Sequence, residues 1–347
     1  MRRVLSVFFS VMLSIFLLAG CGVKTESDGT SDKDKENLHV TYAFVAKEAE
    51  NPYMKKVYEG FEKACKENGA ISLYKSPEEA TSEKQNEIIN QLIEEKVSGI
   101  AIVANDANTL ESTLKKAMKA GIKVVSVDSA VNAESREVHI QQADSEKIGR
   151  GLIQAAYEMI NGNGGIAVLS TTEQAANQRV WISWMEEEIK EHPDKYAKTP
   201  LVRISYGEDD PVKSKSEAQD ILKSTNAKII IAPTSVGMLA AAKVIKGNNS
   251  KVLLTGLGLP SEMATFIENG TCPWMYLWNP VEVGYLAGYT INELKKGEIS
   301  GVKGDTFKAG ILGEKAITEV DYGGTEVMLG DPFKFDKSNI DEWKDVY

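Results

Sequence analysis

Residues 99–129 read GIAIVANDANTLESTLKKAMKAGIKVVSVDS, and this stretch decides the fold class. Its first residues, 99–103, are continuously apolar, and residues 123–127 near its end are mostly valine, which predicts two short buried strands. Between them, residues 108–120 carry apolar side chains at helical spacing, and Gly121 marks the helix end. A strand, a helix and a second strand in this order predict parallel strands in a sheet covered on both faces.

The same alternation extends in both directions from this stretch. Toward the N-terminus we predict strands at 38–45 and 71–74 and helices at 53–68 and 83–96. After a break near 141–144 the pattern restarts, with strands at 166–169, 201–206, 228–232 and 252–254, and helices at 145–160, 178–191, 212–223, 236–245 and 261–268. A last helix at 281–296 follows Pro280, and periodicity does not say where it packs. Two separate runs of this kind predict an α/β protein with two doubly wound parallel sheets.

The length of the globular part also favours two lobes. From residue 38 to the end it has roughly 310 residues, which exceeds the usual size of one domain. We expect a first lobe of 38–142 plus about 280–312, and a second of 143–279 plus about 313–347. In doubly wound sheets, ligands bind beyond the carboxyl ends of the strands, so a hinge and a cleft between the lobes are predicted.

The N-terminus predicts export. Two arginines precede a nearly apolar run at 4–18, which is too short to span a bilayer and fits a signal peptide of residues 1–20. The sequence Leu-Ala-Gly-Cys at 18–21 resembles a bacterial lipobox, which implies a lipid on Cys21; a plain signal peptide with a chance cysteine is the alternative. Residues 21–37 are polar and predict a tether. The expected location is the extracytoplasmic face of the cell membrane, lipid-anchored.

Charge and cysteine content exclude several classes of protein. The net charge of −10 argues against nucleic acid and anionic membrane surfaces as partners. Beyond Cys21 only Cys65 and Cys272 remain, so one disulfide is possible, but we expect two core thiols.

Enzyme motifs are missing from the sequence. The first strand is followed by AKEAENPY without glycine, and TGLGLPS has Ser261 where a dinucleotide fingerprint needs its third glycine. The three histidines are scattered, and neither H-E-x-x-H nor G-x-S-x-G occurs. We therefore expect no catalysis, no cofactor and no metal. The regulatory domain of a sugar-responsive repressor would have the same doubly wound fold, but the predicted export signal at residues 1–20 argues against this class of protein.

Polar and aromatic side chains gather just beyond the predicted strands. Aspartate and asparagine suit vicinal hydroxyls, and aromatic rings cover the apolar faces of a sugar-like ring, which together predict a neutral polyol site. For Asp106 we favour a helix cap. Taken alone, Lys47 could equally be solvated surface, and Trp278 could be core. The candidate ligand-binding residues are Lys47, Tyr53, Asp128, Asn177, Gln178, Pro233, Ser235 and Trp278.

Long segments of the chain resemble a known family. They are NPYMKKVYEGFEKACKENG, the stretch quoted first, IIIAPTSVGMLAAAKV, TGLGLPSEM, LWNPVEVGYLA and DPFKFDKSNID. Over nearly all of 38–347 the chain is similar to the type I periplasmic binding proteins of sugar ABC transporters. It most resembles the branch with the rhamnose-binding proteins and the Lsr-type autoinducer-2 receptors. The resemblance implies a monomer that closes two lobes on a small polyol and docks on an ABC permease.

The resemblance also bears on the ligand. Lys47, Asp128, Gln178 and Pro233 match contact positions of the autoinducer-2 receptors in residue type, whereas Asn177 and Ser235 stand where those receptors have aspartate and alanine. The two departures, with TGLGLPSEM and LWNP, also resemble the rhamnose binders. Autoinducer-2 is placed first, and rhamnose or another monosaccharide such as ribose is the alternative.

Overall fold

The computed structural model describes residues 40–320 and 323–347. The predicted signal peptide, Cys21 and the tether lie outside the described residues. The described residues form one compact unit, which contains two main sheets with helices packed on them. Within the described ranges, no helix is both long and apolar enough to cross a membrane.

The first sheet is mostly parallel. Its strand order is β11-β12-β13-β5-β4-β3-β1-β2, with β12 antiparallel to both β11 and β13 and the other pairs parallel. The order reverses between β1 and β3, which makes this the switch point of the sheet. The strands are β1 (Thr41–Val45), β2 (Ile71–Lys75), β3 (Gly99–Ile102), β4 (Lys123–Val127), β5 (Val138–Ala143), β11 (Thr306–Lys308), β12 (Glu314–Glu319) and β13 (Thr325–Gly330).

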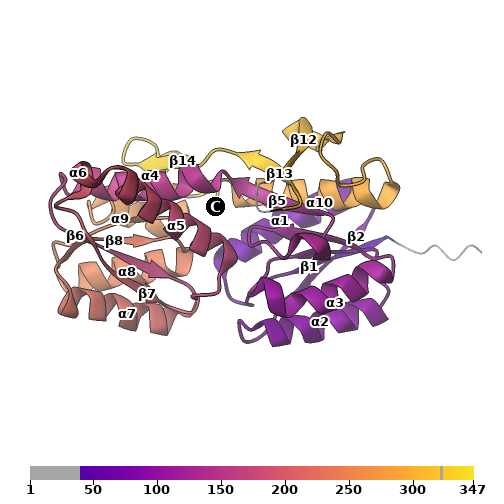
Figure 1. Ribbon diagram of the computed structural model, residues 1–347, viewed down its shortest axis with the longest axis horizontal. Coiled ribbons are helices and arrows are strands. Elements are labelled where there is room, and N and C mark those ends of the chain that lie inside the picture. The colour runs from indigo at the N-terminus through magenta and orange to yellow at the C-terminus, as the bar shows by residue number, and fades with distance from the viewer. Residues whose placement is uncertain (1–39, 321–322) are drawn as a thin grey trace, which may run out of the picture. The chain divides into compact units, whose positions relative to one another are not determined.

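Helices cover both faces of this sheet (Figure 1). Helices α2 (Ser82–Glu94) and α3 (Ala107–Lys119) lie on one face, where they bury alternate strand residues such as Val45 and Ile102. Helices α1 (Pro52–Glu67) and α10 (Pro280–Lys296) lie on the other, over Phe44 and its neighbours. Because successive strand side chains point to opposite faces, a continuously apolar strand such as β3 serves both cores.

The packing of α10, which periodicity left open, is decided by glycines. A Cβ on Gly60 of α1 would lie 1.7 Å from the carbonyl oxygen of Val281, and one on Gly284 of α10 would lie 1.7 Å from that of Val57. No real Cβ approaches an oxygen so closely, so only glycine permits this crossing of the two backbones. Through this close packing against α1, α10 lies on the first sheet although it comes late in the chain.

The second sheet is parallel, in the order β7-β6-β8-β9, with its switch point between β6 and β8. A two-stranded antiparallel ribbon, β10 with β14, continues beside β9 through a bridge between Leu257 and Tyr276. The strands are β6 (Gly165–Ser170), β7 (Leu201–Tyr206), β8 (Ala227–Ala232), β9 (Leu253–Gly256), β10 (Trp274–Leu277) and β14 (Phe333–Asp336). The helices of this half are α4 (Ser145–Met159), α5 (Ala176–Glu191), α6 (Pro193–Tyr196), α7 (Pro211–Ser224), α8 (Ser235–Gly247), α9 (Pro260–Glu268) and α11 (Ile340–Trp343).

The predicted α/β class with two parallel-sheet lobes is confirmed. The chain passes from one sheet to the other three times: between β5 and α4, between β10 and α10, and between β13 and β14. These three connections join the two lobes. Both remaining thiols, Cys65 and Cys272, are buried and free, as expected.

The structure differs from the predictions in two places. The break expected near 141–144 does mark the passage from the first sheet to the second, but strand β5, which ends there, was not predicted because several of its residues are polar. Hydrogen bonds of its two ring nitrogens with Ser126 and Gln141 stabilise the buried His139 of this strand. The boundary near residue 313 was also misplaced. Strands β12 and β13 extend the first sheet, with Val327 opposite Ile140, so both strands belong with the first lobe. These short, largely polar strands gave no sign of which sheet they would join.

Candidate functional site

A cavity of about 50 Å³ is lined by all eight candidate ligand-binding residues. It lies beyond the carboxyl ends of β1 and β4 of the first sheet and of β6 and β8 of the second. The sequence analysis did not identify the other residues that line it. These are Asn51, Met54, Thr171, Trp181, Asp209, Thr234, Leu257 and Leu277.

The strand ends explain why these side chains meet. Lys47 follows β1 by two residues and Asp128 follows β4 directly, on either side of the switch point of the first sheet. Thr171 follows β6 and Pro233 follows β8, on either side of the second switch point. The carboxyl ends of parallel strands lie at the same edge of a sheet, so residues that are distant in sequence come together there.

Asp128 is the central charged group of the cavity. It is 5% exposed and has a left-handed backbone with φ of 59°, which is uncommon outside glycine. Asn177 Nδ2 donates to its Oδ2 at 2.9 Å, and the Tyr53 hydroxyl donates to its Oδ1 at 3.3 Å. Burial raises the pKa of Asp128 to about 6, against the lowering effect of the Lys47 charge; the nearby Asp209 adds to the rise.

Aromatic rings form one wall of the cavity. The Trp278 Nε1 donates to the Tyr53 hydroxyl at 2.6 Å, and the two rings lie edge to face with centroids 6.4 Å apart. Trp181 packs against Trp278, with 5.9 Å between the two ring centroids. Burial, together with the Asp128 charge, raises the pKa of Tyr53 well above its usual value. Trp278 is therefore both a buried packing residue and part of the cavity wall.

Gln178 braces the loop that follows β6. Its Oε1 accepts a hydrogen bond from the Ser170 hydroxyl and another, of 2.9 Å, from the backbone N–H of Thr171. The Asn177 Oδ1 in turn accepts from the backbone N–H of Gln178 at 2.9 Å. These contacts hold the start of α5 and the loop after β6 in a fixed relationship at the cavity.

Asn51 and Asp209 form a second polar link that the sequence analysis missed. The Asn51 carboxamide caps α1 by accepting from the backbone N–H groups of Tyr53 and Met54, and its Nδ2 donates to Asp209 Oδ2 at 2.7 Å. The Thr234 hydroxyl donates to the other Asp209 oxygen at 3.3 Å. Asparagine before Pro-Tyr at a helix start predicts a cap, and nothing local reveals its second partner across the cavity. The predicted cap at Asp106 is also present, since it accepts from Thr109 N–H.

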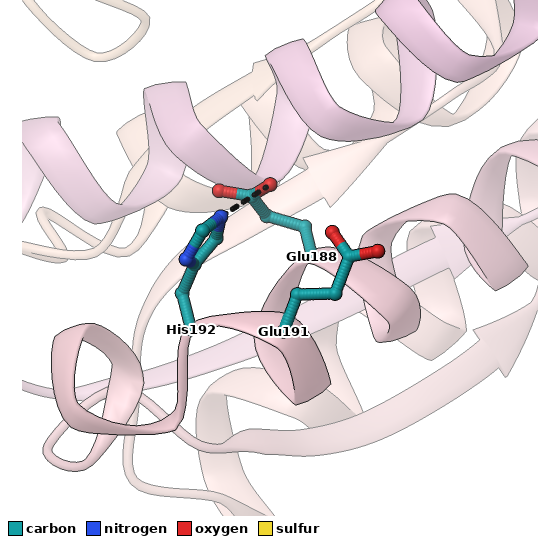
Figure 2. Close-up of side chains that lie close together, drawn as sticks. All are labelled: Glu188, Glu191 and His192. Atoms are coloured by element: carbon teal, nitrogen blue, oxygen red, sulfur yellow. Dashed lines mark ion pairs between the residues drawn. The ribbon is translucent and has the colours of Figure 1, made fainter.

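A separate carboxylate cluster lies at the end of α5, away from the cavity. Figure 2 shows Glu188, Glu191 and His192, with His192 Nε2 3.7 Å from a Glu188 oxygen. Arg150 Nη1 donates to Glu188 at 2.9 Å and to Glu191 at 2.6 Å, and Lys195 lies 3.3 Å from Glu188. Side-chain cations already compensate these carboxylates, so we interpret the cluster as an ion-pair network that joins α4, α5 and α6.

Comparison with known proteins adds a family context. The chain matches the family model described as a periplasmic binding protein domain over residues 42–299. It is 42% identical to an ABC transporter solute-binding protein from Clostridium phytofermentas whose crystal structure contains L-rhamnose. That match covers 89% of this chain and 99% of the other, with a TM-score of 0.85.

Two further solved structures are similar. A sugar ABC transporter protein from Actinomyces odontolyticus is 37% identical, with coverage of 87% of this chain and 97% of that one and a TM-score of 0.68. LsrB from Clostridium saccharobutylicum, in complex with AI-2, is 22% identical, with coverage of 88% and 99% and a TM-score of 0.81. At that identity the likeness to LsrB shows the fold alone.

Proposed function

Because the chain belongs to the periplasmic binding protein family, as a solute-binding protein of a sugar ABC transporter, we propose that it captures a neutral monosaccharide, with L-rhamnose as the first candidate. The observation that carries this proposal is the cavity itself. It brings together carboxylates, carboxamides, an ammonium group and aromatic rings from both lobes. This set of groups suits a ligand that has many hydroxyls and no charge.

The polar groups would bind hydroxyls from two sides. Asp128 and Asp209 are strong acceptors, whereas Lys47, Asn51 and Asn177 supply donors. The Lys47 and Asp128 charges balance each other in part, and among the described residues that line the cavity no second cation stands beside Lys47 to favour phosphate. Each hydrogen bond to a charged partner is stronger than one between neutral groups, so few contacts suffice for a small ligand.

The apolar part of the lining favours a deoxy sugar. Met54, Leu257 and Leu277 share the cavity with the two tryptophans. L-rhamnose carries a methyl group where the corresponding hexose has a hydroxymethyl group, and such a methyl group is best buried among apolar side chains. The relative from Clostridium phytofermentas, whose structure contains L-rhamnose, is also far more similar in sequence than LsrB. On these grounds rhamnose moves ahead of autoinducer-2, which the sequence analysis had placed first.

Autoinducer-2 is kept as a second candidate for a specific reason. Lys47, Asp128, Gln178 and Pro233 keep the residue types of the autoinducer-2 receptors, and all four line the cavity. The proposed site residues are the same for both ligands. Only Asn177 and Ser235 differ from the receptor pattern, and both also line the cavity.

We propose that the ligand acts by closing the two lobes, residues 40–143 with 280–330 and residues 144–279 with 331–347. Hydrogen bonds at the cavity that cross between these ranges run from Asn177 to Asp128, from Asn51 to Asp209 and from Trp278 to Tyr53. A ligand that contacts both lobes only in the closed form shifts the equilibrium toward it. The closed protein, a monomer without catalytic activity, would then deliver the sugar to a permease. Export and a lipid on Cys21 would keep it at the membrane.

Calorimetric titration tests the proposal. The purified chain without residues 1–20 is titrated with L-rhamnose, autoinducer-2 and D-ribose. Saturable heat with L-rhamnose, at higher affinity than with the other two, is the expected result. Tighter binding of autoinducer-2 would establish the second candidate, and no heat from any of the three would contradict the polyol site.

A further inference from the structure

Two buried hydrogen-bonding groups in the cavity lining have no partner within the described chain. They are the Oγ1 of Thr171 and the Nε1 of the Trp181 indole, and both atoms are almost fully inaccessible to solvent. Thr171 is 6% exposed and Trp181 is 2% exposed. Other buried side-chain atoms also lack partners, but among those residues only Thr171 and Trp181 line this cavity.

Both backbone hydrogen-bonding groups of Thr171 are engaged, which fixes the main chain that carries its hydroxyl. Its N–H donates to Gln178 Oε1 at 2.9 Å, and its carbonyl accepts from the N–H of Glu208 at 2.7 Å. The hydroxyl is therefore a preorganised group at the end of β6. A partner that enters the cavity from outside the chain could complete its hydrogen bonding.

Trp181 is placed by the helical repeat of α5. It follows Asn177 by four residues and Gln178 by three, so the three side chains share one face of the helix. The ring is held by contact with Trp278 at 5.9 Å. The two indoles differ in one respect: the Trp278 N–H donates to Tyr53, whereas the Trp181 N–H has no acceptor among residues 40–320 and 323–347.

We propose that Thr171 and Trp181 donate hydrogen bonds to the bound sugar, an inference that rests on the proposed function. A buried donor without an acceptor destabilises the folded chain, and nearly all such groups in native proteins are paired. Two such groups on residues that line the same cavity are explained if the ligand supplies both acceptors. The second lobe then contributes two specific contacts beyond those that the sequence analysis identified.

The chemistry of these donors restricts the ligand. An indole N–H can only donate, so the ligand atom that faces Trp181 is an oxygen acceptor, either a hydroxyl or the ring oxygen. A methyl or methylene group at that position would leave the N–H unpaired and would be rejected. The rhamnose methyl group therefore faces another wall of the cavity, and a hydroxyl-bearing or ring-oxygen edge faces Trp181.

Four variants of the chain without residues 1–20 test the proposal. Thr171→Val removes the hydroxyl at constant volume, and Thr171→Ser restores a hydroxyl. Trp181→Phe removes the indole N–H, and Trp184→Phe is the matched control on the same helix, because Trp184 stacks on Arg150 and does not line the cavity. L-rhamnose affinity is measured by calorimetry, and the melting temperature is measured without sugar.

Affinity and stability should move in opposite directions. We expect T171V and W181F each to weaken L-rhamnose binding about tenfold or more, while T171S recovers most of the loss and W184F leaves affinity unchanged. Without sugar, T171V should melt at or above the temperature of the unaltered chain, because it removes an unpaired buried group. A purely structural hydroxyl would instead give a lower melting temperature with unchanged affinity.

Monodeoxy analogues of L-rhamnose identify the facing oxygen. For one of the 2-, 3- or 4-deoxy sugars, the loss of affinity seen with the unaltered chain should largely disappear in W181F or T171V, since the partner is already gone. If the unaltered chain binds L-rhamnose and both T171V and W181F bind it equally well, the inference is overturned while the proposed function stands. If the unaltered chain binds none of the sugars tested, both are overturned.

Discussion

Asp128 and Asn177 meet in a hydrogen bond of 2.9 Å between a carboxylate that follows a strand of the first sheet and a carboxamide in the first turn of a helix on the second. This contact joins the two lobes at the candidate site. The amide nitrogen donates, so the pair is favourable when Asp128 is charged. Replacement of the amide by a carboxylate would turn an attraction into a repulsion.

We expect Asn177→Asp to lower the free energy of unfolding by about 2 kcal/mol at pH 8, because two buried carboxylates would then face each other. The loss should shrink near pH 5, where one of them binds a proton. Denaturant unfolding at the two pH values measures this. The double variant with Asp128→Asn restores an amide–carboxylate pair with the roles exchanged, and it should recover most of the stability. A loss that does not depend on pH would contradict the repulsion.

Ligand affinity should depend on pH through Asp128. Because the pKa of this buried carboxyl is about 6, the residue loses its charge as the pH falls below that value. A neutral sugar does not titrate, so binding should weaken below pH 6, by up to about tenfold for each pH unit. Calorimetry between about pH 5 and 7.5 gives the profile. Asp128→Asn should bind weakly with a flat profile, and an equally steep profile in that variant would assign the effect to another group.

Stability without ligand should show the opposite trend. The folded-state pKa of Asp128, about 6, lies above the ordinary value of 3.8, so its stabilising contribution is complete below about pH 4 and is lost as the pH rises through 6. The difference corresponds to roughly 3 kcal/mol. We expect Asp128→Asn to gain stability relative to the unaltered chain between pH 4 and 7 in urea unfolding. A constant difference across that range would show that Asp128 does not titrate as described.

Asp128→Ala tests the carboxylate directly. Removal of a buried acceptor leaves Asn177 and Tyr53 without their partner and deprives the ligand of a charged contact. We expect a loss of about 2 kcal/mol or more in L-rhamnose binding, roughly thirtyfold in the dissociation constant. Asp106→Ala, which removes a helix cap outside the cavity, is the control and should change stability without changing affinity. Unchanged affinity in Asp128→Ala would remove this residue from the site.

The crossing of α1 and α10 gives a prediction about folding. A Cβ at Gly284 would lie 1.7 Å from the Val57 carbonyl oxygen, so Gly284→Ala must push the helices apart and should cost about 3 kcal/mol or more. Gly151→Ala on α4 is the matched control, because a Cβ there meets nothing within 4 Å. That change should stabilise the chain by up to about 1 kcal/mol through helix propensity. Similar stabilities for the two variants in urea unfolding would show that the helices can separate cheaply.

The sequence by itself determined the fold class and most of the helices and strands. A continuously apolar run such as 99–103 must be buried on both faces of a sheet whichever strands it pairs with. The apolar pattern is therefore enough to identify the strands, and helical periodicity with a terminal glycine is enough to identify the helices. The eight candidate residues could also be proposed from the sequence, because the carboxyl ends of parallel strands lie at one edge of a sheet whatever the details of packing. The family resemblance then distinguished Lys47 and Asp128 from ordinary surface and capping residues.

Only the tertiary structure decided which distant groups meet. Asn51 has the sequence of a helix cap, and its contact with Asp209, 158 residues later, depends on how the two lobes face each other. The unpaired hydroxyl of Thr171 and the unpaired indole of Trp181 are likewise properties of the folded chain, because a missing partner is visible only when every neighbour is in place. The same holds for strands β12 and β13 of the first sheet. The local pattern can specify a strand, but packing and hydrogen bonding across the whole fold decide which strands it pairs with.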